Sequence, residues 1–190
     1  MLRFKTIALV LFVLLSKGAE ISAVWPFPRR FNTGSMGLRL GSNFSIQLCG
    51  PLEYDAPQDL RDAIGRTLVE LRNNRMERLL VGGASADSIK LSDAKSLNIL
   101  QLDITNITAG QSQIASIAQN SILPLGKRDE SYMLSVPPDG SAATLEAASS
   151  LGLFRGLTTF LQLWYWNGTI SYTVKAPIHI EDTPAYVSWG

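Results

Sequence analysis

Several short segments of the chain alternate apolar with polar side chains, and this period of two residues is typical of strands that bury one face. The clearest case is Leu100, Leu102 and Ile104, which are separated by polar residues. A turn signal of two prolines followed by Asp-Gly lies at 137–140, so the segments on either side of it are expected to form a hairpin. The strand predictions are 38–48, 100–104, 132–136, 143–147, 169–174 and 178–180.

Two longer segments show helical spacing instead. In 59–78 the apolar residues recur every three or four positions among charged ones, and Pro57 stands just before this segment, where a helix start tolerates proline. The mostly apolar segment 149–166 is predicted to be a second helix that ends at Asn167-Gly168. Gly152 and Gly156 share one face of it, and their cost to helix stability indicates close approach of a sheet backbone.

These elements together favour one α+β domain, in which an antiparallel or mixed sheet carries helices packed on one face. The chain has 190 residues, of which 46% are apolar and 17% charged, as expected for one globular domain behind a short leader. We expect a signal peptide at 1–23, the domain at 24–176, and the opening of a further unit at 177–190.

The N-terminus has the three-part layout of a secretory signal peptide. Arg3 and Lys5 precede an uninterrupted apolar run at 7–15, and small residues follow. The run is shorter than the ~20 residues of a membrane span. We therefore expect a secreted protein without a membrane anchor, cleaved after Gly18 or after Ala23.

Charge and sequons agree with this expectation. Removal of residues 1–23 changes the count of basic against acidic residues from 17 and 16 to 14 and 15, and such a near-neutral chain has no basic surface for nucleic acid. Three sequons mark candidate glycosylation sites: Asn43, Asn106 and Asn167.

The chain offers little material for a metal or catalytic centre. Cys49 is the only cysteine, which excludes an internal disulfide and leaves either a small buried hydrophobe or a thiol that pairs with a partner. His179 is the only histidine, which excludes an H-E-x-x-H zinc site. We interpret His179 with Glu181 as a structural pair and Asp129-Glu130 as part of a solvated loop. No cofactor and no metal are expected.

An aromatic run, Trp164-Tyr165-Trp166, has two interpretations. Its rings could stack on sugars, or they could anchor the end of the second helix in a core or an interface. The second interpretation is favoured because the preceding helix is apolar on most sides.

Four stretches resemble one known family in order and spacing, and the resemblance spans essentially the whole chain after the leader. They are WPFP at 25–28, ESYMLSV at 130–136, LGLFRGLTTF followed by Gln162-Leu163 at 151–163, and IEDTPAY at 180–186. Together they resemble the N-terminal domain of fungal β-N-acetylhexosaminidases of glycoside hydrolase family 20.

The resemblance implies a small α+β domain called zincin-like, although it binds no zinc, followed by a (β/α)₈ barrel with the active site. In that barrel an Asp orients the 2-acetamido group of the substrate and the adjacent Glu is the general acid. Neither carboxylate is present here, and Trp189 stands where the family has a substrate-contacting arginine. The resemblance therefore implies no catalytic and no substrate-binding residue in this chain.

Three functions remain open on the sequence. The first is an accessory domain, as a fragment or a free-standing product, whose partner is the catalytic barrel of a secreted enzyme that removes terminal N-acetylhexosamine from chitin oligomers or glycans. The second is a module that binds N-acetylglucosamine glycans through Trp164, Tyr165, Trp166 or Trp189. The third is a protein that binds a full-length hexosaminidase.

Overall fold

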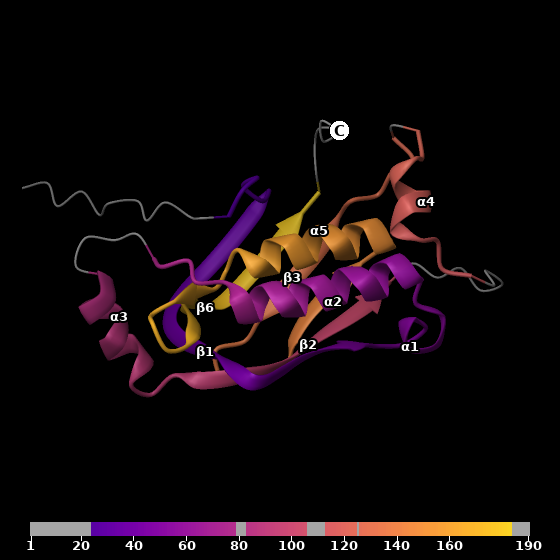
Figure 1. Cartoon of the computed structure of the whole chain (residues 1–190). Coiled ribbons are helices and arrows are strands. Elements are labelled where there is room, and N and C mark those ends of the chain that lie inside the picture. The colour runs from indigo at the N-terminus through magenta and orange to yellow at the C-terminus, as the bar shows by residue number, and fades with distance from the viewer. Residues whose placement is uncertain (1–23, 79–82, 106–112, 125, 184–190) are drawn as a thin grey trace, which may run out of the picture.

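The computed structural model describes residues 24–78, 83–105, 113–124 and 126–183. The predicted signal peptide, the sequon at Asn106 and the Trp189 position lie outside these residues. Within them the chain forms one sheet with helices over it (Figure 1). The strands are β1 (Arg30–Leu48), β2 (Lys95–Ile104), β3 (Tyr132–Val136), β4 (Ala143–Ala147), β5 (Tyr165–Trp166) and β6 (Ser171–Asp182). The helices are α1 (Leu52–Asp55), α2 (Gln58–Asn73), α3 (Gly83–Leu91), α4 (Ile117–Ser121) and α5 (Ser150–Leu161).

The sheet is mixed, as predicted, with the strand order β1-β2-β4-β3-β6-β5. β2 runs parallel to both β1 and β4, whereas the other pairs are antiparallel. The predicted hairpin of β3 and β4 is confirmed, with Leu134 opposite Leu145. Its turn contains Gly140 at φ +82°, a conformation that favours glycine.

The long strand β1 joins two distant parts of the sheet. Its first half pairs with β6, as in Phe31 opposite Ile180, and its second half pairs with β2, as in Ile46 opposite Leu100. β1 therefore connects both sides of the β2-β4-β3-β6 block and curls the sheet around its buried face. Two register shifts in the pairing with β6 and one in the pairing with β2 allow this bend.

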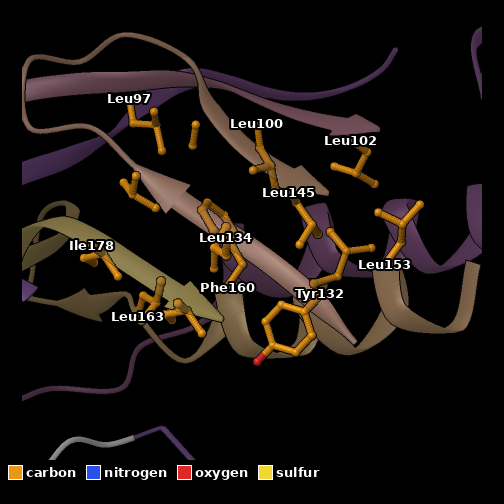
Figure 2. Packing of buried hydrophobic residues seen from close by; sticks show 14 of the residues in the cluster. Leu97, Leu100, Leu102, Tyr132, Leu134, Leu145, Leu153, Phe160, Leu163 and Ile178 are labelled. Atoms are coloured by element: carbon orange, nitrogen blue, oxygen red, sulfur yellow. The ribbon is translucent and has the colours of Figure 1, made fainter. Parts of the chain in front are cut away.

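The core lies between the sheet and the helices α2 and α5, which run side by side over one face (Figure 1). Leu100, Leu134 and Leu145 come from three adjacent strands and are fully buried (Figure 2). They meet Leu153 and Phe160 of α5 in one hydrophobic cluster. The alternation in the sequence thus reports the buried face of the sheet, and the predicted placement of helices on one face is confirmed.

Gly152 and Gly156 explain how α5 approaches the sheet. A Cβ on Gly152 would lie 2.3 Å from the backbone oxygen of Ser131, so the predicted close backbone approach is confirmed there. A Cβ on Gly156 would meet the Leu145 side chain at 2.2 Å, so at this position a side chain, not a backbone, occupies the space.

Both predicted helices end earlier than the sequence pattern indicates. α2 stops at Asn73, and Asn74 is already extended at ψ 125°. α5 stops at Leu161, because Tyr165 and Trp166 pair with β6 instead of continuing the helix. The prediction that Asn167-Gly168 ends the helix is therefore wrong, since these residues form the turn between β5 and β6.

The two strand predictions near the C-terminus are one continuous strand, β6. Pro177 cannot donate a ladder hydrogen bond, and the partner β1 changes register beside it, between Thr33 and Met36. Residues 178–182 pair with β3, so this part of the predicted C-terminal unit belongs to the sheet of the domain.

Candidate functional site

The only histidine lies on the open face of the sheet. Ile178 and Ile180 point into the core, so His179 and Glu181 share the opposite face, as predicted from their spacing. The His179 Nε2 atom lies 3.6 Å from Glu181 Oε1, and Arg30 Nη1 lies 2.7 Å from Glu181 Oε2. All three side chains are substantially exposed, so they form a cluster of charges at the surface.

The neighbouring carboxylates Asp129 and Glu130 differ sharply in burial. Asp129 is exposed, but Glu130 is only 7% exposed, so the interpretation of the pair as a solvated loop is wrong for Glu130. Arg155 Nε donates to Glu130 Oε2 at 2.7 Å, and Arg128 Nη1 lies 3.8 Å from Glu130 Oε1. Burial of the carboxylate is offset by these cations.

The same ion pair connects two of the stretches that carry the family resemblance. Glu130 begins the segment that leads into β3, and Arg155 lies on α5, 25 residues later. Ser149 caps α5 by accepting the backbone N–H of Gly152 at 3.0 Å, and its hydroxyl donates to the Asp129 carbonyl at 2.5 Å. These residues hold the first turns of α5 to the segment just before β3, which is a structural task.

The aromatic run splits into a buried and a surface part. Trp164 is 3% exposed and packs edge-on against Phe160, with ring centroids 5.5 Å apart. The predicted anchoring in the core is confirmed for Trp164, which cannot stack on a sugar. Trp166 is half-buried, and the Arg75 guanidinium lies over its ring at 4.1 Å.

No pattern in the sequence predicts a buried polar cluster that lies near Trp166. Arg78 Nη1 donates to Asp87 Oδ1 at 2.6 Å, and the Tyr172 hydroxyl donates to Asp87 Oδ2 at 3.0 Å. Burial raises the pKa of Tyr172 to about 12, and the Asp87 carboxylate adds to this shift, while Arg78 opposes it. Sequence reasoning missed the cluster because it placed Arg78 inside a helix and because 85 residues separate Asp87 from Tyr172.

Two of the three predicted glycosylation sites fall on described residues. Asn43 is exposed on β1, within the segment where the pairing with β2 changes register between Leu40 and Ser45. Asn167 is exposed in the turn between β5 and β6. Both positions are accessible from the surface, as a sequon requires.

Cys49 is half-buried, so it is neither a fully buried hydrophobe nor a fully exposed thiol. Burial raises the pKa of its thiol, and the carboxylates of Asp103 and Glu53 add to the shift, so the reactive thiolate is disfavoured. The described residues contain no group of three or more His, Cys, Asp or Glu side chains that could hold a metal ion. In the same part of the chain, no helix is long and apolar enough to cross a membrane.

Comparison with known proteins agrees with the fold. A family model described as "beta-acetyl hexosaminidase like" matches residues 24–163. Beta-hexosaminidase 1 of Arabidopsis thaliana is 27% identical over 194 residues, an alignment that covers 94% of this chain and 33% of that protein. This chain thus spans about a third of the length of that relative.

Two solved structures share the fold at low sequence identity. The chitobiase of Flavobacterium johnsoniae has a TM-score of 0.53 at 21% identity, over 87% of this chain and 21% of that one. The N-acetyl-β-hexosaminidase of Streptomyces plicatus has a TM-score of 0.50 at 18% identity, over 87% of this chain and 27% of that one. Because the family model matches well over half of the chain, the chain belongs to the β-acetyl hexosaminidase-like family, the N-terminal domain of the family 20 hexosaminidases.

Proposed function

We propose that this chain is the accessory N-terminal domain of a secreted β-N-acetylhexosaminidase that removes terminal N-acetylhexosamine from chitin oligomers or glycans. The observation that carries the proposal is the family match over residues 24–163. The domain itself performs no chemistry in this proposal. It supports the folding and assembly of a separate catalytic domain.

The use of the family's characteristic residues supports this structural role. Glu130 and Arg155 pair with each other, and Gly152 lets α5 contact the backbone at Ser131. The contacts of these residues join α5 to the segment that leads into β3. The only histidine, His179, lies at the surface beside Glu181 and Arg30.

The glycan-binding alternative finds less support among the described residues. Trp164 is buried in the core, and Arg75 covers one face of Trp166. Neither residue presents the broad exposed ring on which a free sugar chain would stack.

A complementation assay tests the proposed function. The purified chain is expected to release no fluorophore from a fluorogenic N-acetylglucosaminide. Co-expression of the chain with the separately encoded barrel of a family 20 hexosaminidase is expected to increase the yield of soluble, active barrel, and the two should co-purify. An unrelated secreted α+β domain of similar size serves as the control.

Two outcomes contradict the proposal. Turnover by the chain alone that survives repurification would show catalysis within it. An active barrel whose yield is the same with the chain and with the control domain would remove the accessory role.

A further inference from the structure

A hollow of about 270 Å³ lies between α3, the segment after α2 and the turn between β5 and β6. In Figure 1, α3 and this turn lie at the same end of the molecule. The volume is just below the ~300 Å³ at which small-molecule pockets begin, so the hollow suits one ring and not an oligosaccharide. Its lining includes Glu77, Arg78, Asp87, Trp166, Asn167 and Tyr172.

The lining of the hollow is held rigidly. The Asp87 carboxylate is 3% exposed and receives Arg78 on one oxygen and the Tyr172 hydroxyl on the other. The backbone N–H of Trp166 donates to the Met76 carbonyl at 2.8 Å, which fastens the segment after α2 to β5. The hollow is therefore a preformed feature, and its strongest acceptor, Asp87, already has partners within the protein.

Asn167 is oriented by its own turn. Its side-chain Oδ1 accepts the backbone N–H groups of Thr169 at 3.0 Å and Ile170 at 2.9 Å. Because the amide oxygen is held by the turn, the Nδ2 atom on the other side of the amide faces away from it. Gly168, at φ +94°, allows the chain to take this tight turn, since a side chain would be strained there.

Trp166 supplies an apolar surface beside this amide. The Arg75 guanidinium covers one face of the indole at 4.1 Å, and the remaining part of the ring lines the hollow. An indole next to polar side chains such as Glu77 and Arg78 matches a sugar ring, which has an apolar face and polar substituents.

We propose that Asn167 carries an N-linked glycan whose first N-acetylglucosamine ring packs in this hollow against Trp166. The inference rests on the secretory placement in the proposed function. In the reaction, Asn167 Nδ2 bonds to the anomeric carbon of a lipid-diphosphate-linked oligosaccharide. The bond from that carbon to the diphosphate oxygen breaks, the lipid diphosphate leaves, and the amide proton passes to a base of the transferase.

The covalent link explains why a small hollow suffices. A free sugar loses translational and rotational freedom when it binds, and the contacts of one ring are too few to offset that cost. A ring attached to Asn167 is already at high effective concentration beside Trp166, so modest contacts are enough to seat it. The seated ring would connect the β5–β6 turn to Arg78 and α3.

The test uses the full chain secreted from a eukaryotic host, with each sequon read by glycopeptide mass spectrometry. We expect Asn167 to be modified. Trimming the glycan enzymatically to one N-acetylglucosamine is expected to leave the thermal midpoint unchanged. Thr169→Ala, which keeps Asn167 but removes its sequon, is expected to lower the midpoint by about 2–4 °C. Ser45→Ala, which removes the sequon at Asn43, is the matched control and is expected to leave it unchanged.

A second variant separates packing of the sugar from damage to the fold. In a Trp166→Leu background, adding Thr169→Ala is expected to cause no further loss, because the ring has lost its contact surface. An equal loss in both backgrounds overturns the seating on Trp166.

Because the occupancy of each sequon is measured separately, failure of this inference can be told apart from failure of the proposed function. Modification at Asn43 but not at Asn167 overturns the inference and leaves the secretory placement standing. Absence of modification at both sites also overturns the inference, whereas failure of the host to secrete the chain overturns the secretory placement. A modified Asn167 with no thermal difference from Thr169→Ala overturns the role of the hollow.

Discussion

Single polar residues connect α5 to the sheet at positions where the surroundings are otherwise apolar. The Tyr132 hydroxyl lies 2.6 Å from Thr159 Oγ1, and both side chains are buried. Burial raises the pKa of Tyr132 to about 12, the hydrogen bond to Thr159 opposes this shift, and Asp182 adds to it. The neutral phenol is therefore the form that fits the folded protein.

This burial predicts a loss of stability in alkaline solution. Tyr132 ionises near its ordinary pKa of 10.0 in the unfolded chain but near 12 in the folded one. Its contribution is thus fully present below pH 10 and is lost as the pH rises toward 12. Tyr132→Phe is expected to lower the free energy of unfolding by about 1 kcal/mol at pH 7, because the hydrogen bond to Thr159 is lost. Above pH 10 the free energy of unfolding of this variant is expected to decrease less steeply than that of the wild type.

Urea unfolding at a series of pH values from neutral to strongly alkaline measures both effects. Tyr54→Phe is the matched control, because Tyr54 is 80% exposed. If Tyr132→Phe and the wild-type chain lose stability equally above pH 10, the pKa of Tyr132 is not raised by folding.

At the scale of the element, α2 and α5 place glycine in opposite environments. Gly152 of α5 is pressed against the backbone of the segment before β3, whereas a Cβ on Gly65 of α2 would have no atom within 4 Å. The same residue type therefore serves close packing in one helix and only weakens the other.

This contrast predicts substitutions of opposite sign. Gly152→Ala is expected to destabilise the protein by about 1–3 kcal/mol, because the new methyl group overlaps the Ser131 carbonyl. Gly65→Ala is expected to stabilise it by about 0.5–1 kcal/mol through helix propensity alone. Chemical denaturation of both variants beside the wild type measures the two values, and a neutral Gly152→Ala would contradict the packing of α5.

A glycan on Asn167 would change how the β5–β6 turn is fastened to α3. Asp87 of α3 already binds Tyr172 of β6 and Arg78 of the segment after α2, and the Arg78 and Asp87 side chains are less than a tenth exposed. A sugar on Trp166 would add a second link on the solvent side of the same hollow.

Among the residues that the structure describes, the buried apolar side chains form two separate clusters of unequal size. The large cluster includes residues from β1, β2, β3, β4, β6, α2 and α5. The small one contains Leu91 at the end of α3 together with Tyr172 and Val174 of β6. Among the side chains of α3 that the structure describes (87–91), Leu91 is the buried apolar one, and it belongs to this small cluster.

We expect α3 to open without unfolding the rest of the domain. Backbone amides of 83–91 should exchange with deuterium faster than those of 150–161, since local opening exposes only the small cluster. Hydrogen exchange read by mass spectrometry measures this difference. Equal protection in the two helices would mean that α3 unfolds only with the main core.

The sequence predicts those structural features that are determined by residues close to one another along the chain. The strands β2, β3 and β4 follow from alternation, because a period of two reports which face of a strand is buried. The start of α2 and the close approach at Gly152 follow from spacing and from the cost of glycine in a helix. The resemblance carried by 130–136 and 151–163 predicted the family correctly.

Only the tertiary structure decided what depends on residues far apart. α5 ends at Leu161 because Tyr165 and Trp166 find partners on β6, and β6 is continuous because β1 adapts its register beside Pro177. Glu130 is buried because Arg155 reaches it, and Asp87 because Arg78 and Tyr172 do. Local patterns fix which faces must be buried, whereas burial of a charge depends on a partner that only the folded chain brings close.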